Sequence, residues 1–562
     1  MDPVPQPSEP PHEQPADPAH EQPADLAHEQ PADLAHEPRP TTRPDAPGDG
    51  EPLVAGGTPR PQGGVSGGVV GGAAGADLDA LRRRAAGVLA GLPAEARELG
   101  ERFRAAGHEL ALVGGPVRDA FLGRVSADLD FATSASPDET QRLLARWGDA
   151  HWDIGKAFGT IGARRRVAGG QDVVAEVTTY RTDAYDPASR KPLVAFGDTL
   201  EGDLSRRDFT VNAMAVRLPD LVFVDPFDGL ADLAAGVLRT PIAPDRSFDD
   251  DPLRMMRAAR FAAQLGMALD PAADAAVRAM ADRITIVSAE RVRDELTKLL
   301  LAARPRPGLE LLVDSGLAAH VLPELPALQL EIDEHHRHKD VYEHSLTVLD
   351  RAIALETGPD GPVPGPDLVL RLAALLHDVG KPRTRRFETG GGVSFHHHEV
   401  VGAKLASARL KALRFDKQTV KDVARLTELH LRFHGYGEGE WTDSAVRRYV
   451  TDAGPLLQRL HRLTRSDCTT RNVRKARRLS AAYDDLEARI VRLQEAEELA
   501  AVRPDLDGTQ IMEVLGIPPG REVGAAYGYL LGLRMERGPL GEDVARAELL
   551  RWWADRTGAA GS

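Results

Sequence analysis

The segment ELALVGGPVRDAFLGRVSADLDFATS, residues 109–134, constrains the fold more than any other part of the chain. An apolar strand ends in Gly114-Gly115, a helix is expected to open at Val117, and a second strand carries the D-L-D motif. A glycine turn lets the backbone approach a phosphate closely, and amides at a helix N-terminus favour an anion. This order of elements predicts an α/β unit with a phosphate-binding turn.

The D-L-D motif predicts a metal-dependent phosphoryl-transfer site. Asp128 and Asp130 alternate along the predicted strand, so both side chains project from one face while Leu129 points into the core. Two neighbouring carboxylates repel each other unless a divalent cation neutralises them. Two-metal sites, with cations about 3.5–4 Å apart, use such a pair. Glu176, in VVAEVTTYR, is the candidate third carboxylate, and a solvent-facing strand glutamate is the alternative.

A set of charged and amide side chains is suited to contact a nucleotide. Arg118 follows the glycine turn, where it could hold a triphosphate. The segment LSRRDFTVNAMA is expected to precede an apolar helix, and it offers Arg206, Arg207, Asp208, Thr210 and Asn212. This mixture suits a ribose and a triphosphate, with Arg207 and Asp208 the foremost candidates. The alternative is a salt-bridged helix start.

The segment FDDDPLRMMRAARFAAQLG predicts a helix that recognises a base. Asp251, Arg254, Arg257 and Arg260 are spaced by three and are expected to share one broad helical face. A carboxylate accepts from an exocyclic amine, while a guanidinium donates to the adjacent ring nitrogen. Cytosine and adenine present that pattern, so the Asp251 and Arg254 pair would admit CTP and ATP and reject GTP and UTP. Arg257 and Arg260 remain for phosphates or for structural ion pairs.

The order of patterns predicts several domains, because cores rarely grow beyond about 250–300 residues. Strands mixed with helices come first and helices dominate later, which favours an α/β head followed by all-α regions. Residues 1–76 repeat HEQPADPA and HEQPADLA and end in a Gly-rich run, a composition expected to be disordered. The predicted boundaries are 1–76 for this acidic tail and 77–240 for the α/β head. The helical regions that follow are expected to cover residues 241–335, 336–480 and 481–562.

Charge and cysteine content exclude several classes of protein. Of the net charge of −15, the tail carries twelve acidic and three basic side chains, so the remaining chain is only mildly acidic. No apolar run approaches the roughly 20 residues of a membrane span. The single cysteine, Cys468, excludes a disulfide framework and fits a reducing compartment. We expect a soluble cytoplasmic protein without a membrane partner.

A second group of residues predicts a metal centre in the later, helical part. His377-Asp378 ends an apolar helix in LRLAALLHDVGKPRT, and further candidates recur on predicted helices: His344, His398, His430 and Asp467. Imidazoles and carboxylates are suitable ligands for Mn²⁺, Fe²⁺, Ni²⁺ or Zn²⁺. One isolated histidine would mean little, but six ordered candidates predict a bound divalent ion of unknown identity.

Five ordered motifs resemble those of the bacterial class II tRNA nucleotidyltransferase and poly(A) polymerase family. They are LVGGPVRDAFLGR…DLD, RRDFTVNAMA, DPFDGLADLAAGVLRT, DDPLRMMRAARF and SAERVRDELTKLL. The resemblance implies a polymerase-β-like nucleotidyltransferase head, a helical neck and body, and an RNA substrate. It also implies that Asp128 and Asp130 bind Mg²⁺ and that nucleotide contacts come from the other motif residues: Gly114, Gly115, Arg118, Arg207, Asp208, Asn212, Asp251, Arg254, Arg257 and Arg260. The base-recognition motif departs slightly, beginning Asp250-Asp251 instead of Glu-Asp.

The family contains enzymes that add CCA to tRNA and enzymes that add only adenylates. GKAFGTIGARR…EVTTYRTD is more similar to the CCA-adding branch, and RTDAYDPASRKPLVAFGDTLEGDLS matches the mobile loop associated with the switch between nucleotides. We therefore predict CCA addition to tRNA, with poly(A) synthesis as the alternative. A nonenzymatic RNA-binding protein is a further alternative, which the retained carboxylates and arginines argue against.

The later motifs, with LLHDVGK at their centre, resemble the HD superfamily of metal-dependent phosphohydrolases. The resemblance implies an all-α HD domain in which His344, His377, Asp378 and Asp467 form the basic metal set. His398 and His430 could hold a second ion, and Lys381 could neutralise a phosphate. The alternative is a domain that retains the motifs without turnover. Five basic residues within 471–478 could contact RNA or form a solvated helix start, and residues 507–538 resemble the RNA-gripping end of the family.

Overall fold

The computed structural model describes most of the chain beyond its N-terminal tail. The described residues are 77–125, 128–167, 172–184, 193–330, 340–389, 392–433, 436, 441–469, 472–497 and 503–558. The predicted tail, residues 185–192 of the predicted mobile loop, and the predicted boundary at residue 335 lie outside them. Within these ranges no helix is both long and apolar enough to span a membrane.

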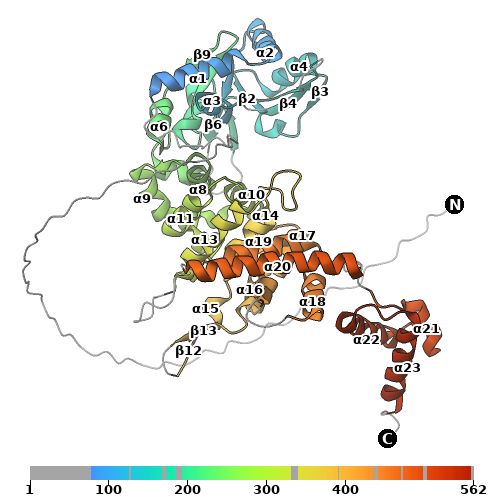
Figure 1. Cartoon of the computed structure of the whole chain (residues 1–562). Coiled ribbons are helices and arrows are strands. Elements are labelled where there is room, and N and C mark those ends of the chain that lie inside the picture. Colours follow the sequence, from blue (N-terminus) through green and yellow to red (C-terminus); the bar gives the residue numbers. More distant parts are fainter. Residues whose placement is uncertain are drawn as a thin grey trace, which may run out of the picture. The chain divides into compact units, whose positions relative to one another are not determined.

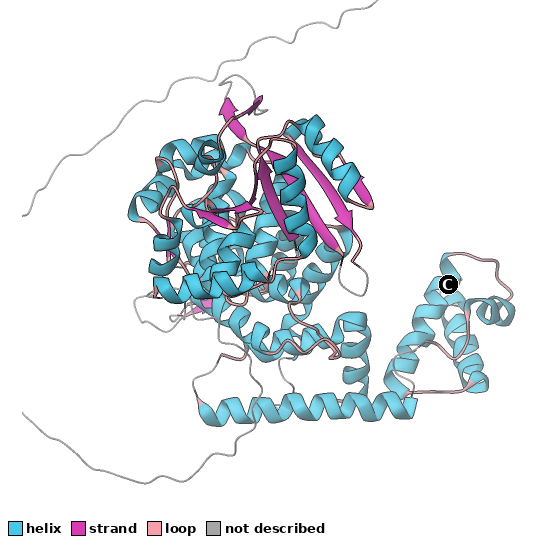
Figure 2. Cartoon of the chain, turned by 90° about the horizontal axis from the view of Figure 1, so that it is seen from above, coloured by secondary structure: helices cyan, strands magenta, loops and turns pink. Residues whose placement is uncertain are grey.

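A seven-stranded mixed sheet is the centre of the head (Figure 1), and it contains most of the strands (Figure 2). Its strands are β1 (Leu110–Val113), β2 (Asp128–Thr133), β3 (Ala150–Trp152), β4 (Thr160–Arg165), β5 (Val173–Thr179), β8 (Ala215–Leu218) and β9 (Val222–Val224). They follow the order β3-β4-β5-β2-β1-β8-β9; β2 and β5 run parallel, and the other neighbours run antiparallel. The predicted α/β head is confirmed, and β2 begins at the D-L-D motif.

The two faces of this sheet are packed with different side chains. Leu112 of β1 joins large apolar side chains of three helices, α1 (Leu78–Ala90), α2 (Ala94–Ala105) and α4 (Pro137–Trp147). Ala111 and Ala132, which point the other way, join the buried face of α5 (Leu200–Ser205). Asp130 alternates with Leu129 and Phe131, both of which are buried with the first face. Asp130 therefore projects from the second face, where small alanines leave room for a ligand.

Two sequence predictions about helices in the head are wrong. The amphipathic pattern of residues 78–107 predicts one helix, but the segment divides into α1 and α2 at Gly91-Leu92-Pro93. Pro93 has no N–H to donate, and its ring disfavours a helical residue before it, so the first helix must stop. The apolar helix expected after Asn212 is instead strand β8, paired with β1 and β9. A short apolar run fits a buried strand as well as a helix, and here its neighbours decide.

The middle of the chain is helical, as predicted. After α6 (Gly229–Ala235), which packs in the head core, it runs through α7 (Pro244–Asp250), α8 (Leu253–Leu265), α9 (Pro271–Met280), α10 (Ala289–Leu300), α11 (Arg306–Asp314) and α12 (Leu317–Val321). Then follow α13 (Val341–Ala354), α14 (Leu368–Leu376), α15 (Lys381–Thr384), α16 (His398–Ala412), α17 (Lys417–Leu429), α18 (Asp443–Ala453), α19 (Leu457–Asp467) and α20 (Val473–Glu497). One continuous apolar core runs from Phe248 to Leu493. The predicted boundary at residue 480 falls inside α20.

The C-terminal region forms a small helical module. Its helices are α21 (Gly508–Leu515), α22 (Arg521–Arg537) and α23 (Glu542–Gly558). Ile511, Leu530 and Leu549 are buried in an apolar cluster that contains residues of this module alone. Arg447 of α18 donates to the Met535 carbonyl at 3.1 Å, which ties α22 to the preceding helices.

Candidate functional sites

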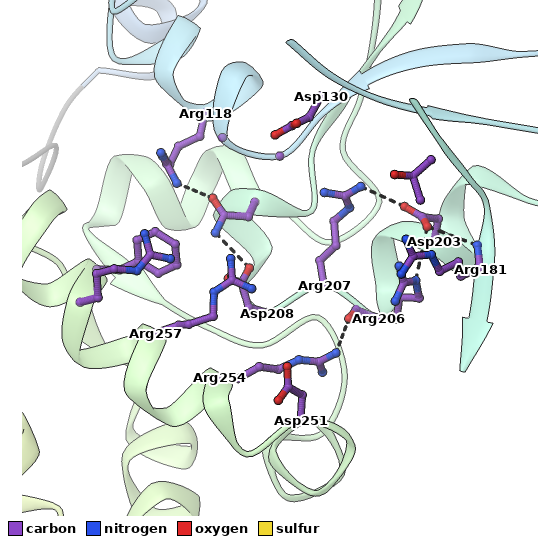
Figure 3. A pocket seen from close by; sticks show the side chains of 16 residues that line it. Arg118, Asp130, Arg181, Asp203, Arg206, Arg207, Asp208, Asp251, Arg254 and Arg257 are labelled. Atoms are coloured by element: carbon purple, nitrogen blue, oxygen red, sulfur yellow. Dashed lines mark hydrogen bonds and ion pairs between the residues drawn. The ribbon is translucent and has the colours of Figure 1, made fainter. Parts of the chain in front are cut away.

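A pocket of about 460 Å³ opens on the second face of the head sheet (Figure 3). It brings together predicted residues from three of the five ordered motifs: Gly114, Gly115, Arg118, Asp130, Arg207, Asp208, Asn212, Asp251, Arg254, Arg257 and Arg260. It is also lined by Arg206, a further candidate of the segment that carries Arg207, and by residues that the sequence did not single out: Thr178, Arg181, Asp203 and Phe261. The concentration of guanidinium groups makes the pocket suited to a polyanion such as a triphosphate.

The glycine turn positions one wall of the pocket. Gly114 has a φ of 73°, a left-handed conformation that favours glycine, and a Cβ there would lie 3.0 Å from Arg207 Nη1. Helix α3 (Gly115–Phe121) starts directly after it, two residues before the predicted start at Val117. Arg118 of this helix donates through Nη1 to Asn212 Oδ1 at 2.6 Å, so two predicted nucleotide contacts support each other.

Asp130, one of the two carboxylates of the predicted metal pair, stands at the edge of this pocket. Asp130 is exposed and lines it. In the parallel pairing of β2 with β5, Asp130 is the register partner of Glu176, and Asp128 is the partner of Val174. Side chains at paired positions share a face, so Glu176 lies beside Asp130 on the pocket side of the sheet. The side chain of Asp128 lies outside the described set, although its backbone begins β2.

Asp208 is buried behind the pocket and organises its floor. Its Oδ1 accepts from Asn212 Nδ2 at 3.0 Å and from the Phe209 amide at 2.8 Å, while Arg257 Nη2 lies 3.0 Å from Oδ2. Burial alone would raise the pKa of Asp208, but Arg257 and these hydrogen bonds hold it below its usual value. An ionised Asp208 thus fixes Asn212 and Arg257 at the pocket wall (Figure 3).

Asp203 is a functional candidate that the sequence motifs did not single out. It is 1% exposed, and its carboxylate lies 3.0 Å from Arg207 Nη2 and 3.3 Å from Arg206 Nε. It also accepts from the Arg181 amide at 3.3 Å. Burial opposes its ionisation, but the two arginines keep the pKa of Asp203 below its usual value. The spacing to Arg206 and Arg207, which follow Asp203 by three and four residues at the end of α5, was the available signal.

Asp251 and Arg254 both line the pocket, but only Arg254 lies on the helix that was predicted to carry them both. Asp251 does not share the helical face: it lies between α7 and α8 in an extended conformation, with φ −147° and ψ 97°, because Pro252, the N-cap of α8, disfavours a helical residue before it. Arg291 of α10 donates to its Oδ2 at 2.9 Å. Arg254 of α8 is buried and donates through Nη1 to the Ser247 carbonyl and hydroxyl at 3.0 and 2.9 Å. Both side chains nevertheless line the same pocket (Figure 3).

The last arginine of α8 is held by an aromatic ring and an acid. Arg260 lies over the Phe261 ring at 4.0 Å and donates through Nε to Glu295 Oε2 at 2.6 Å. Arg118 also approaches this ring, at 5.4 Å. Burial lowers the pKa of Arg260 from its usual value, although the guanidinium stays charged at neutral pH. Phe261 and Glu295 therefore position the positive charge that the sequence predicted.

The six predicted ligands of the helical region converge on one centre. His344 of α13 and Asp467 at the end of α19 approach to 3.0 Å, and His377 Nε2 lies 3.2 Å from Asp378 Oδ2. His398 Nε2 lies 3.3 Å from the other oxygen of Asp378. Within each of two groups of three residues, the ligand atoms all lie within 4.8 Å of one another. One group is His344, His377 and Asp378, and the other is Asp378, His398 and His430. Asp378 belongs to both groups, as a bridging ligand would.

The histidines at this centre are oriented for metal binding. Nδ1 of three rings meets a backbone carbonyl: Ala374 for His377 at 2.9 Å, Phe395 for His398 at 2.7 Å and Thr427 for His430 at 2.6 Å. A proton on Nδ1 leaves Nε2 as the lone-pair atom, which is the usual arrangement of a metal-binding histidine. The buried Nε2 atoms of His398 and His430 have no hydrogen-bond partner in the described chain. This donor set fits a divalent cation.

The charges at this centre also favour a cation. Burial alone would raise the pKa of Asp378, but His377 and Lys381 hold it well below its usual value. Burial opposes protonation of His377, yet Asp378 and Asp467 raise its pKa to about 10, so the two carboxylates attract a proton to the Nε2 atom that a metal ion would contact in its place. Lys381 Nζ lies 2.6 Å from Asp378 Oδ2, so the predicted phosphate-neutralising lysine borders the site.

Three family models match separate parts of the chain. Residues 110–239 match the "Poly A polymerase head domain" and residues 341–497 match the "HD domain". Residues 266–328 match the "Probable RNA and SrmB- binding site of polymerase A". The head match covers the sheet and the pocket residues that precede α7, and the HD match contains all six converging ligands.

The chain is also similar to characterised enzymes over most of its length. It is 34% identical to the A-adding tRNA nucleotidyltransferase of Deinococcus radiodurans over 454 residues, which cover 80% of this chain and 96% of that protein. It is 32% identical to the CC-adding tRNA nucleotidyltransferase of Thermus thermophilus over 458 residues, covering 80% and 94%. The CCA-adding enzyme of Lacticaseibacillus paracasei is 39% identical over 247 residues, covering 44% and 59%. The crystal structure of Bacillus stearothermophilus CCA-adding enzyme in complex with CTP shares the fold, with a TM-score of 0.57 at 24% identity, covering 83% of this chain and 98% of that one.

Proposed function

The chain belongs to the tRNA nucleotidyltransferase and poly(A) polymerase family, and from this we propose that it builds or repairs the 3′-terminal CCA of tRNA from CTP and ATP. One observation carries the proposal: the pocket that joins Asp130, the arginine-rich wall, and the Asp251 and Arg254 pair. Addition requires no nucleic-acid template because the pair itself would select cytosine and adenine. The single cysteine agrees with action in the cytoplasm.

Different residues of the pocket serve different parts of the reaction. The 3′-hydroxyl of the tRNA attacks the α-phosphate of the nucleotide, a new phosphodiester bond forms, and pyrophosphate leaves. Arg118 and Arg207 hold the triphosphate, and the amides after Gly114 face the same anion. Glu176, beside Asp130, supports the attacking hydroxyl. Enzymes of this family use divalent ions; Mg²⁺ held by Asp128 and Asp130 would stabilise charge on the transferring phosphoryl group.

Single-nucleotide incorporation tests this proposal. A tRNA that ends before its CCA is incubated with CTP alone, ATP alone, or both, and products are resolved by length. We expect two added residues with CTP, none with ATP, and three with both. An enzyme that stops after CC, or that extends only a tRNA already ending in CC, would match the specialised relatives and contradict our proposal. A long adenylate tail would establish poly(A) synthesis instead.

A second activity is proposed for the HD centre: metal-dependent hydrolysis of a terminal phosphate or cyclic phosphate on RNA. The observation that favours it is the shared orientation of three imidazoles around Asp378. A divalent ion held there would lower the pKa of bound water and make hydroxide available. Lys381 is placed to neutralise the phosphate. Asp378→Ala should abolish hydrolysis and leave nucleotide addition within twofold of wild type; survival of hydrolysis would refute the assignment.

A further inference from the structure

A second cavity, of about 470 Å³, lies beside the HD centre. It is lined by Arg383, Thr384, Arg385, Arg386, His396 and His397. These residues come from α15, from the strand β12 (Arg386–Phe387), and from the segment between β13 (Val393–Ser394) and α16. None of the six HD-centre ligands lines it, so the cavity is distinct from the metal centre.

The cavity is cationic. In the described chain, no carboxylate lies within ion-pairing distance of Arg383, Arg385 or Arg386. Glu388 instead accepts from Ser394, and Glu399 lies within 4.0 Å of His397 and His398. Three guanidinium groups without local compensation, beside two histidines, create a positive potential that attracts phosphates.

An exposed aromatic ring accompanies these arginines. Phe387 is 72% exposed, an unusual exposure for a phenylalanine, and the Arg385 guanidinium lies 4.7 Å from the centre of its ring. An exposed ring beside a guanidinium plane offers a base a surface on which to stack, while neighbouring arginines contact the backbone. A small phosphorylated compound would need the charges but not the ring. The combination favours single-stranded nucleic acid.

Short chain segments connect the cavity to the metal centre. Lys381, which contacts Asp378 at 2.6 Å, begins the helix that carries Arg383. His398 follows the cavity residue His397 directly, and its Nδ1 bonds to the Phe395 carbonyl. A Cβ on Gly380 would lie 2.0 Å from the His398 carbonyl, so the two segments pack closely. A strand bound in the cavity would thus have its end near Asp378.

We infer that this cavity and Phe387 form a binding subsite for the single-stranded 3′ end of an RNA, which it presents to the HD centre. Phe387 stacks on a base, and Arg383 and Arg386 contact the phosphates that precede the terminal one. The inference rests on the proposed HD activity and extends it by naming the residues, outside the metal centre, that bind the RNA end. Free mononucleotides would use the metal centre without the subsite.

Hydrolysis by the full-length protein tests the subsite. The substrates are a 12-nucleotide RNA with a 2′,3′-cyclic phosphate and adenosine 2′,3′-cyclic monophosphate, each with Mn²⁺ or Ni²⁺. The double variant Arg383→Ala/Arg386→Ala should raise KM for the RNA at least tenfold and leave KM for the mononucleotide within twofold. In a plot of log KM for the RNA against log salt concentration, the slope should fall by about 1.4, since the variant loses two single-strand phosphate contacts and each contributes about 0.7.

Matched variants separate recognition from folding. Arg82→Ala/Arg83→Ala removes the same charge from exposed positions of α1 and should change neither KM. Phe387→Ala should raise KM for the RNA without raising KM for the mononucleotide, and Phe387→Trp should restore the KM for the RNA. Equal losses for RNA and mononucleotide, or stronger inhibition by a nucleoside triphosphate than by a non-hydrolysable RNA, would overturn the inference in favour of a structural or small-molecule role.

Cross-linking keeps the inference testable if the HD centre hydrolyses nothing. That result would remove the proposed HD activity alone. A short RNA with 4-thiouridine near its 3′ end is irradiated with the unmodified protein, and cross-linked peptides are identified by mass spectrometry. We expect adducts within residues 383–387 or 396–397, which disappear in Arg383→Ala/Arg386→Ala. Adducts confined to the head or to the C-terminal module would refute the subsite.

Discussion

Replacing Asp203 with asparagine should impair nucleotide addition although no motif identified this residue. The buried carboxylate holds Arg207 at 3.0 Å and Arg206 at 3.3 Å, and both guanidinium groups line the pocket. Asparagine retains one oxygen but loses the charge, so about one charge-assisted hydrogen bond is lost, worth about 1.5–3 kcal/mol. If that energy positions Arg207 for the triphosphate, kcat/KM for CTP and ATP should fall roughly 10- to 150-fold.

The assay is steady-state addition to a tRNA that lacks its CCA end, with each nucleotide varied in turn. Asp198→Asn is the matched control because Asp198 is exposed and lies five residues upstream. Arg206 and Arg207 are 23% and 24% exposed, so water can partly replace the lost acceptor and the folding cost should stay small. Phosphoester hydrolysis at the HD centre should be unchanged, which checks the integrity of the rest of the chain.

A double-mutant cycle distinguishes positioning from general damage. Once Arg207→Ala has removed the guanidinium, adding Asp203→Asn should cost much less than it does alone, because the two residues act as one unit. Additive losses would show that Asp203 acts through something other than Arg207. Activity of Asp203→Asn within threefold of wild type would refute the reasoning altogether.

Three further predictions concern the head. Asp130→Asn should lower CMP and AMP incorporation roughly 100- to 1000-fold, the loss typical of removing one electrostatic group at a reacting centre, while HD-centre hydrolysis persists. Equal loss of both activities would argue for misfolding. Asp208→Asn should destabilise the head at about pH 7. The fold holds the pKa of Asp208 below its value in the unfolded chain, so the ionised carboxylate stabilises the fold at neutral pH and this contribution fades below about pH 4. Amide hydrogen exchange of head peptides at about pH 7 and below about pH 4 measures the destabilisation, and a destabilisation that does not change with pH would contradict the prediction. Gly114→Ala should destabilise by about 1–3 kcal/mol through its left-handed φ and its approach to Arg207, whereas Gly87→Ala, in an open helical position, should be neutral or stabilising in the same urea titration.

The sequence was informative wherever one short motif carried the chemistry. The glycine turn, Asp130, Arg118 and Arg207 meet in one pocket as their motifs predicted. The HD ligands were equally predictable because histidine and aspartate at these positions have few other uses, and they converge on Asp378. Local chemistry, rather than secondary-structure pattern, made these predictions possible.

Errors arose where tertiary context decides the outcome. Asp251 was expected on a helical face because a spacing of three fits a helix, but Pro252 follows it as the N-cap and the helix begins only at Leu253. The run after Asn212 was expected to be helical, although β1 and β9 make it a strand. Asp203 was missed because an acid three and four residues before two arginines is common on any helix surface. Only burial distinguishes it.

A residue of helix α10 orients Asp251, so the motif that contains Asp251 and Arg254 does not by itself define the base-recognition site. Arg291 donates to Asp251 Oδ2, and the Leu253 amide donates to Oδ1 at 3.2 Å, so both oxygens have a fixed direction. Four residues further along the same helix, Glu295 holds Arg260. The carboxylate that would accept from the base amine is thus oriented by a residue forty positions later, and Arg291→Ala should loosen the discrimination between CTP and UTP more than it slows addition of CMP. Unchanged discrimination in competition assays would mean that the Leu253 amide alone orients Asp251.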